Sequence, residues 1–432
     1  MGTAPLTGCA ATVSYPVAVH AAQTSDRRRE SKGTYLRRRI GVFGAAGLIL
    51  AGLAYLPLTL LAPLAPATAT AVAPVPLENP PVELAWPGYG ASALGAVGFP
   101  GTLAAGGSTE PRTIASITKV VTSLVVLDAR PLSQGEDGPV ITFSRTDAAL
   151  YHKYFALQGK VEPVRAGLEL TQRQLLTVVL VSSANNYAES LATWGFGSES
   201  AFLSAARTWL DANGLTDTTL LDSTGMNPGN TSTAGDLVEL AKIALADPVV
   251  SSIVRMPSAS LPYIGAFQNT NELLGIDGVD GIKTGTLDEA GACLLFSASI
   301  TVAEHPVEVV GVVLGGPDHA ALNVAVRELL ASAVAGFREI TLVEAGEVFY
   351  EYATPWEQSA RAVAVEGASL LVWAGSPVSE HTAASDVREG TKGQRVGSAT
   401  FTVAGESVSV PLALDGELGD PGPWWRLTHP FG

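Results

Sequence analysis

The sequence is poor in cysteine, in histidine and in positive charge, and each shortage excludes a class of protein. Two cysteines in 432 residues cannot build a disulfide framework. The six histidines are scattered, so neither a zinc site nor a Ser–His pair has local support. Phosphate binding requires Lys and Arg on a surface, so the net charge of −15 argues against nucleic acid as the main partner.

Lysine is scarce as well, with 7 lysines against 19 arginines, so each lysine can be followed individually. The hydrophobic fraction of 47% excludes a wholly disordered chain. At about 100–200 residues per domain, 432 residues allow two or three domains.

Charge is distributed unevenly at the N-terminus. Residues 1–39 carry a net charge of +5, and no charged residue lies between Arg39 and Glu78. Residues 40–62 (IGVFGAAGLILAGLAYLPLTLLA) would span about 34 Å as a helix, enough to cross a bilayer. The basic cluster is expected to stay in the cytoplasm as a tail over 1–39, which places the C-terminal part outside the membrane.

Two interpretations of residues 40–62 remain open. A retained transmembrane signal-anchor is favoured, because the basic region and the apolar run are both long for a cleaved signal. A cleaved signal peptide followed by release to the cell wall is the alternative, since 65–67 (APA) and 67–69 (ATA) are small-x-small sites. The preceding arginines and a Pro/Ala/Thr-rich linker over 63–84 argue against a buried core helix.

Export changes what can be expected of the rest of the chain. Cys9 would be cytoplasmic and Cys293 external, so the two cannot pair. Cys293 lies in an apolar run and is expected to be a small buried residue. ATP and nicotinamide chemistry become improbable outside the membrane, and no cofactor or metal is expected.

The periodicity predicts an α/β (α+β) protein in which helices lie against an antiparallel sheet. The expected helices are 117–129, 171–181, 186–194, 199–213, 233–246 and 319–337. The expected strands are a hairpin over 91–105 and a meander of 281–287, 292–302 and 307–315. From about residue 338 the chain is rich in strands and turns, which predicts a small separate all-β domain with strands at 362–365, 369–373, 397–403 and 407–412.

Three short motifs carry the chemistry. The only Ser-x-x-Lys is Ser116-Ile-Thr-Lys119, the only Ser-x-Asn is Ser183-Ala-Asn185, and the only Lys-Thr-Gly begins at Lys283. Each motif alone is weak, because a Ser/Lys pair on a helix is usually a solvated surface pair. Their order, and separations of 67 and 100 residues in an exported chain, make the combination specific.

This triple signature is found in class A β-lactamases and penicillin-binding proteins. The sequence most closely resembles the serine D-alanyl-D-alanine carboxypeptidases over residues 85–340. The resemblance extends to the stretches 114–119, 183–186, 269–271, 278–285 and 288–291. It implies a DD-peptidase catalytic domain over 85–340 with an all-helical subdomain, and a C-terminal β domain over 341–432. Two departures are Leu287, where threonine is common, and the lack of an evident C-terminal amphipathic helix.

The residues themselves explain how such a site could work. A serine hydroxyl needs a neighbouring base, and Lys119 faces the same way as Ser116 at i and i+3 of a helix. Lys119 can act as that base only if burial and a second cation, Lys283, lower its pKa. The backbone N–H groups of Ser116 and Thr286 would form the oxyanion hole.

Ser183 would complete the catalytic group by relaying a proton between Lys119 and the leaving amine. The other motif residues would bind substrate, and Asn185 would hydrogen-bond the substrate amide. Lys283 and Thr284 would hold a substrate carboxylate, which makes a C-terminal residue the natural leaving group. Gly285 would let the substrate backbone lie close to the strand.

The predicted activity is acylation of Ser116 by a peptidoglycan stem peptide, loss of D-alanine and hydrolysis. The expected partners are stem peptides, β-lactams and, through the N-terminal helix, the membrane, with no nucleic acid. A β-lactamase is one alternative, but the acidic residues between Asn185 and Lys283, namely Glu189, Glu199, Glu239 and Glu272, form no convincing deacylating motif. A non-catalytic cell-wall binding protein is the other alternative.

Several further residues are expected to have structural roles or to lie on the surface. Asn186, Asp280, Asp288 and Glu289 are assigned structural roles, and His152 and His319 are assigned to the surface. The stretch Asp222-Ser-Thr-Gly225 is a single copy in a loop, which argues against an aspartic protease. Trp424 and Trp425 are expected to cap the β domain rather than to lie at a membrane interface.

Overall fold

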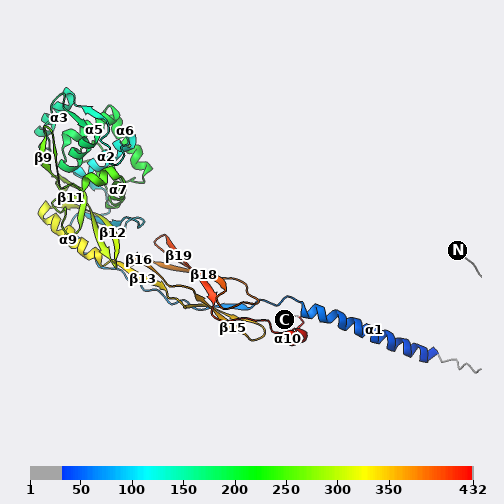
Figure 1. The fold of residues 1–432 in the computed structure, drawn as a ribbon. Helices are drawn as coiled ribbons and strands as arrows, with labels where there is room; N and C mark the ends of the chain where they lie inside the picture. Colours follow the sequence, from blue (N-terminus) through cyan, green and yellow to red (C-terminus); the bar gives the residue numbers. More distant parts are fainter. Residues whose placement is uncertain (1–31, 431–432) are drawn as a thin grey trace, which may run out of the picture. The chain divides into compact units, whose positions relative to one another are not determined.

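The computed structural model describes residues 32–430, which form two compact units. One unit comprises the chain up to Ala65 together with the segment from Asp420 onward, and the other comprises Pro66–Gly419. Most of the expected cytoplasmic tail, including Cys9, lies outside the described residues. Figure 1 shows the ribbon with the labels used below.

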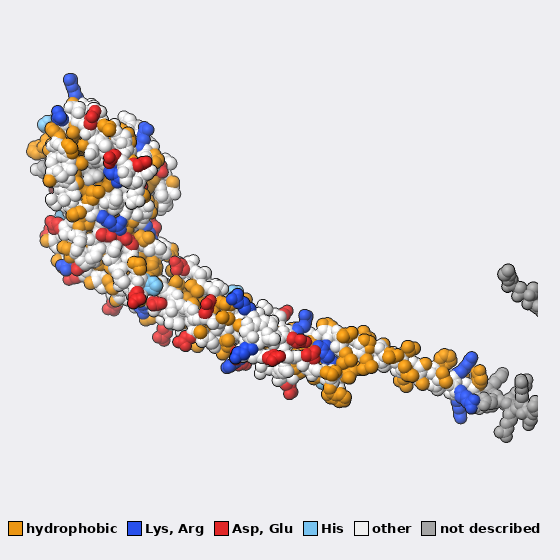
Figure 2. All heavy atoms as spheres, in the orientation of Figure 1, with side chains coloured by type: hydrophobic (Ala, Val, Ile, Leu, Met, Phe, Trp, Pro, Cys, Tyr) orange, Lys and Arg blue, Asp and Glu red, His pale blue; other side chains and the backbone are white. Residues whose placement is uncertain are grey.

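The first unit is built on α1 (Lys32–Leu60), which contains most of the predicted apolar span. Its most apolar window has a mean hydropathy of 1.9 and no part of that window is buried. By length and composition α1 can therefore cross a membrane. Figure 2 shows hydrophobic side chains along α1, with basic side chains at the end where it begins. The short helix α10 (Pro423–Thr428) belongs to the same unit.

The second unit contains the predicted antiparallel sheet. Its strand order is β10-β11-β12-β2-β3, and each neighbouring pair runs antiparallel. The strands are β2 (Ala91–Ala96), β3 (Ala104–Gly107), β10 (Val279–Leu287), β11 (Gly291–Val302) and β12 (His305–Gly316). The predicted hairpin and meander are thus confirmed.

Both faces of this sheet are buried, which explains the nearly continuous apolar runs of β11 and β12. The helix α9 (His319–Val334) packs on one face, with a core that includes Leu322, Val326 and Phe296. The helix α7 (Ala234–Ala246) packs on the other face and joins the larger core beneath the helical part. The fold class predicted from the sequence, a sheet flanked by helices, is confirmed.

The remaining helices form the helical part next to α7 (Figure 1). They are α2 (Thr118–Ala129), α3 (Arg145–Ala156), α4 (Gln172–Thr177), α5 (Asn185–Phe196), α6 (Glu199–Ala212) and α8 (Pro248–Val254). The predicted N-cap of α4 is confirmed, since Thr171 and Gln174 form a capping box. Helix α3, which begins with a capping box at Ser144, and α8 were not predicted.

Three two-stranded ladders complete this part. They pair β4 (Arg112–Thr113) with β7 (Thr231–Ser232), β5 (Val140–Thr142) with β6 (Glu169–Thr171), and β8 (Ser258–Leu261) with β9 (Gly265–Gln268).

The all-β region consists of a six-stranded sheet and a two-stranded sheet. The larger has the order β1-β14-β15-β19-β18-β17, and the smaller pairs β13 with β16. The strands are β1 (Thr68–Ala71), β13 (Phe337–Val343), β14 (Val348–Ala353), β15 (Ser359–Ala364), β16 (Ala368–Trp373), β17 (Val378–Ala384), β18 (Arg395–Val403) and β19 (Glu406–Leu414).

The expected domain boundaries differ from the structure in two places. Within the expected linker 63–84, β1 pairs antiparallel with β14 as an edge strand of the six-stranded sheet. Its Ala/Thr sequence gave no strand signal, and the pairing is with residues nearly 300 positions away. Beyond Gly419 the chain leaves the β region, so Trp424 and Trp425 belong to the unit of α1 and the expectation that they cap the β domain is wrong.

An aromatic cluster joins the two-stranded sheet to the core beneath α9. The ring of Phe337 makes edge contacts with Trp373 at 4.8 Å and with Phe99 at 5.5 Å, measured between centroids. Phe337 and Trp373 are buried in the same core as Leu329 and Leu330 of α9. This cluster therefore ties β13 and β16 to the rest of the second unit.

Replacing Trp373 with alanine is expected to destabilise the second unit, because truncating a buried tryptophan costs about 3–5 kcal/mol. Calorimetry should show a clear fall in Tm. The control Phe155→Ala removes an aromatic ring that is exposed and should leave Tm nearly unchanged. Equal Tm values for the two variants would contradict the role of the aromatic cluster.

Candidate active site

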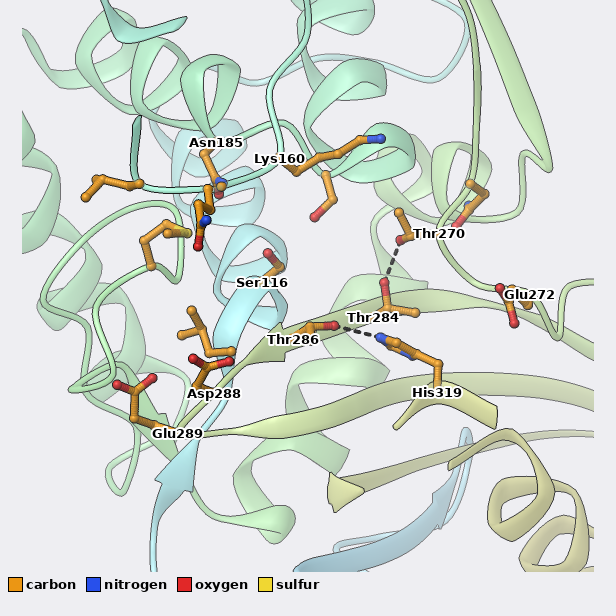
Figure 3. Close-up of a pocket in the computed structure, with 18 residues that line it drawn as sticks. Ser116, Lys160, Asn185, Thr270, Glu272, Thr284, Thr286, Asp288, Glu289 and His319 are labelled. Carbon is orange, nitrogen blue, oxygen red and sulfur yellow. Dashed lines mark hydrogen bonds between the residues drawn. The ribbon is translucent and has the colours of Figure 1, made fainter. Parts of the chain in front are cut away.

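The three sequence motifs meet around one hollow of about 650 Å³ (Figure 3). Six of the eight predicted site residues line it: Ser116, Ser183, Asn185, Thr284, Gly285 and Thr286. The two predicted lysines, Lys119 and Lys283, are buried behind this lining, with exposed fractions of 0% and 1%. The site thus combines an open polar hollow with two enclosed amines.

Ser116 lies in a 3₁₀ turn, Ala115–Ile117, which leads directly into α2. Its neighbour Ala115 has a φ of 46°, in the left-handed region that non-glycine residues seldom adopt. The turn places the serine at the start of the helix, where backbone N–H groups and the helix dipole favour negative charge. One turn later, the Nζ atom of Lys119 lies 2.8 Å from the Oγ atom of Ser116.

The amine of Lys119 is fully enclosed by hydrogen-bond partners. Besides Ser116, it donates to Oδ1 of Asn185 at 2.8 Å and to the carbonyl oxygen of Thr224 at 2.6 Å. Burial lowers the pKa of Lys119 well below its ordinary value, the nearby Lys283 ammonium lowers it further, and Asp222 opposes the shift. A neutral amine in contact with a serine hydroxyl can accept the proton of that hydroxyl.

The second motif follows an irregular stretch of helix. A π-helical turn, Val178–Ser182, ends at Ser183, whose φ is 68°, and α5 begins at Asn185. This geometry places Asn185 on the amine of Lys119 and Ser183 in the wall of the hollow. The partners of the Lys119 amine are Ser116, Asn185 and Thr224, so a proton relay through Ser183 stays a prediction.

The third motif lies on β10, beside the serine turn. The Nζ atom of Lys283 lies 3.4 Å from Oγ1 of Thr270 and 3.3 Å from the carbonyl oxygen of Thr284. Burial lowers the pKa of Lys283 to about 7. The hydroxyls of Thr270 and Thr284 are 2.5 Å apart and both line the hollow. A bound carboxylate would therefore meet the two threonine hydroxyls, with the charge of Lys283 behind them.

Gly285 has a packing role that the sequence did not predict, while its expected role beside the substrate stays a prediction. A Cβ atom at this position would lie 2.8 Å from the carbonyl oxygen of Ile114 and 3.2 Å from the backbone nitrogen of Ser116. The first distance is shorter than real Cβ atoms show, and the second is tighter than most real Cβ contacts. The missing side chain thus lets β10 pack directly against the serine turn, whatever the substrate does.

His319 is the first site residue that sequence reasoning missed. It was assigned to the surface, but its Nε2 atom lies 2.6 Å from Oγ1 of Thr286 and its ring lines the hollow (Figure 3). It is the first residue of α9, which Asp318 caps. No local pattern links residues 286 and 319, because only the packing of α9 on β11 and β12 brings His319 to the neighbouring strand β10.

The loop after β-bridge residue Thr219 was also missed. Asp222 accepts hydrogen bonds from the backbone nitrogens of Thr224 at 2.8 Å, Gly225 at 2.6 Å and Asn227 at 2.7 Å. These bonds fix the carbonyl of Thr224, which the amine of Lys119 contacts. Asp222, which the sequence analysis assigned only to a loop, therefore helps to form the pocket around Lys119.

Acidic residues lie at the edge of the hollow. Asp288 and Glu289, which were expected to be structural, line it together with Glu272 and Lys160 (Figure 3). Asn186, in contrast, bonds the backbone of Glu162. Asp280 accepts a hydrogen bond from Ser297 at 2.6 Å and pairs with Arg255 at 3.0 Å.

Two of the four glutamates considered for a β-lactamase, Glu189 and Glu199, are engaged elsewhere, whereas Glu272 lines the hollow. Glu189 accepts hydrogen bonds from Tyr154 and Lys153, and Glu199 accepts them from Ser223. Neither glutamate is among the residues that line the hollow.

Comparisons with known proteins agree with the fold. A family model described as D-alanyl-D-alanine carboxypeptidase matches residues 101–318, which is half of the chain. The chain is 33% identical over 204 residues to a D-alanyl-D-alanine endopeptidase of Pseudomonas aeruginosa, covering 46% of this chain and 62% of the relative. It is 26% identical to the D-alanyl-D-alanine carboxypeptidase DacA of Escherichia coli, covering 54% and 58% respectively. The chain thus spans about three fifths of these relatives.

Solved structures show the same architecture. Penicillin binding protein 6B of Escherichia coli matches with a TM-score of 0.57 and 21% identity, covering 79% of this chain and 99% of that one. The structure of PBP3 from Streptococcus pneumoniae matches with a TM-score of 0.55 and 24% identity, covering 76% and 98%. At these identities the likeness concerns the fold alone.

Replacing Asp222 with alanine is expected to lower Tm, because it leaves three backbone N–H groups without their acceptor. Each buried unsatisfied donor costs about 1–3 kcal/mol. The matched control Asp128→Ala removes an exposed carboxylate near the end of α2. If calorimetry gave both variants the wild-type Tm, Asp222 would not be holding the loop.

Proposed function

The chain belongs to the D-alanyl-D-alanine carboxypeptidase family, and from this premise we propose that it removes the terminal D-alanine of peptidoglycan stem peptides. The observation that carries this proposal is the 2.8 Å contact between Ser116 and the buried amine of Lys119. Acyl transfer needs a serine with a base in reach; Ser116 lines the hollow, and Lys119 is buried directly behind it.

The chemical steps follow from the positions of these groups. Lys119 accepts the proton of Ser116 as Oγ bonds to the carbonyl carbon of the scissile peptide. The backbone N–H groups of Ser116 and Thr286 bind the resulting oxyanion. The C–N bond then breaks, and the proton passes from Lys119, through Ser183, to the nitrogen of the departing D-alanine. Water hydrolyses the ester by the reverse proton transfers and regenerates Ser116.

Selection of a C-terminal residue would come from the strand side of the hollow. The hydroxyls of Thr270 and Thr284 offer hydrogen bonds to a carboxylate, and the buried Lys283 supplies positive charge nearby. The Thr286–His319 pair lies on the same side of Ser116 (Figure 3). Asn185 remains the predicted partner of the substrate amide. These groups favour cleavage next to a free carboxylate.

Endopeptidase activity is the second candidate, because the Pseudomonas aeruginosa relative and an Escherichia coli relative at 32% identity both bear that name. The leaving group would then be the side-chain amine of a diamino acid in a cross-linked peptide. The acidic residues Glu272, Asp288 and Glu289 at the edge of the hollow would lie close to the ammonium that this amine becomes after it departs.

The same acylation would make the chain a target of β-lactams, whose strained amide takes the place of the peptide bond. We further propose that α1 is retained as the membrane anchor and that the site works on the outer side of the membrane. In this arrangement the β region has a positional role and takes no part in bond cleavage.

Release of D-alanine from a stem pentapeptide tests the proposed activity. Wild-type protein should release D-alanine, and Ser116→Ala should lower kcat by about 10³-fold or more, since it removes the nucleophile. The exposed variant Ser204→Ala serves as the control. Unchanged release by Ser116→Ala would refute the assignment, whereas cleavage of a cross-linked dimer but not of the pentapeptide would favour the endopeptidase.

The pH dependence of kcat/KM should be bell-shaped, since Lys119 must be neutral and Lys283 must be charged. Activity should rise with pH through the lowered pKa of Lys119. It should fall as pH passes about 7, where Lys283 loses its proton. In Lys283→Arg the alkaline limb should disappear, because a guanidinium keeps its charge. An alkaline limb that persists in this variant would show that another group causes it.

A further inference from the structure

The C-terminal segment contacts the end of α1. Helix α10 lies beside the last turns of α1, and Oη of Tyr55 donates a hydrogen bond to the carbonyl oxygen of Leu427 at 2.7 Å. A hollow at this contact is lined by residues from both segments, among them Ala62, Trp425, Arg426 and His429. The ring of Trp425 stacks on His429 with centroids 4.7 Å apart.

Arg426 makes the most specific part of this contact. Its Nη1 atom donates to the carbonyl oxygens of Leu60 at 3.3 Å and Ala62 at 2.8 Å. The last carbonyls of a helix lack partners within the helix and carry partial negative charge, so a cation there is stabilising. Arg426 thus caps α1 from a position more than 360 residues away in sequence.

Asp420 fixes the orientation of that guanidinium. Its Oδ2 atom accepts from Nη2 of Arg426 at 2.6 Å, and its Oδ1 atom accepts from the backbone of Gly422 at 2.6 Å. Asp420 therefore ties the turn that begins α10 to the arginine that reaches α1. Only 14% of the Arg426 side chain is exposed, which shows that it is enclosed by the contact.

The outer surface of this contact is apolar. Trp424 is 78% exposed, and Leu58 and Leu61 at the same end of α1 are 73% and 81% exposed. The apolar side chains along α1 lead up to this end (Figure 2). Tryptophan is enriched in the headgroup region of a bilayer, because its ring is largely apolar while its indole N–H can stay hydrated.

We propose that residues Asp420–Thr428 form a clasp that fastens the C-terminus to the outer end of α1 and places Trp424 in the lipid headgroup layer. The clasp rests on the proposed membrane anchor and adds a second contact with the same membrane. Continuity with the exposed apolar surface of α1 identifies lipid, rather than a second copy of the chain, as the partner.

The clasp also bears on the fate of the N-terminal helix. The carbonyls that Arg426 binds, those of Leu60 and Ala62, precede both candidate cleavage sites at 65–67 and 67–69. Cleavage at either site would remove the partner of Arg426. The clasp therefore requires that α1 remains part of the mature chain.

The full chain reconstituted in phosphatidylcholine–phosphatidylglycerol vesicles tests the clasp. Lipids brominated near the headgroup should quench part of the tryptophan fluorescence. Trp424→Phe should lose that quenched component, and Arg426→Ala should lose it too because α10 is released. The controls are Trp209→Phe, which alters a ring packed on the helical core, and Arg388→Ala, which removes an exposed arginine. Both controls should keep the component.

Two further measurements separate the possible failures. Unchanged D-alanine release by Arg426→Ala in detergent would show that this variant is folded. If the chain floats with vesicles but Arg426→Ala keeps full quenching, the clasp is refuted and the anchor stands. If cross-linking joins two chains through their C-termini and lipid does not quench Trp424, a second copy is the partner and the proposal is overturned. Failure to float would refute the anchor and the clasp together, while the D-alanine assay would still report on the proposed reaction.

Discussion

The site depends on holding two lysine amines inside the protein, one of them against a serine hydroxyl. Removing an ammonium from water is unfavourable, and a second ammonium nearby adds repulsion, so Lys119 is driven toward its neutral form. A neutral amine 2.8 Å from Ser116 is a base already in place. Most of the surrounding fold can be understood as the means of enclosing these two amines while leaving the serine open to the hollow.

Two segments of the helical part and one strand of the sheet enclose the two lysine amines. The end of a π-helical turn brings in Asn185, and the loop ordered by Asp222 presents the carbonyl of Thr224. Strand β10 carries Lys283 and approaches the serine turn closely because residue 285 has no side chain. Two covered faces keep this sheet rigid, so the position of β10 relative to Ser116 is set by the whole core.

Much of this arrangement could be predicted from the sequence, because the motifs are short and local. Ser116 and Lys119 share one helix turn, and the strand meander has the apolar runs of a sheet buried on both faces. What could not be predicted depends on packing between distant segments. His319 reaches Thr286 only through the placement of α9, and Thr270 meets Thr284 across a loop. The sequence places Asp222 in a loop but does not show that its carboxylate binds the backbone of that loop. Strand β1 and Arg426 both bind segments that lie hundreds of residues away in sequence. No periodic pattern in the sequence predicts either pairing.

The central claim is that Ser116 is the nucleophile and that Lys119 activates it. Mass spectrometry of the intact full-length protein after incubation with benzylpenicillin tests this most directly, because a β-lactam traps the acyl-enzyme. The account predicts a mass increase of one penicillin, which peptide mapping locates on Ser116. It also predicts that the adduct forms much more slowly in Lys119→Ala. An adduct on another residue, or equally fast acylation without the lysine amine, would contradict it.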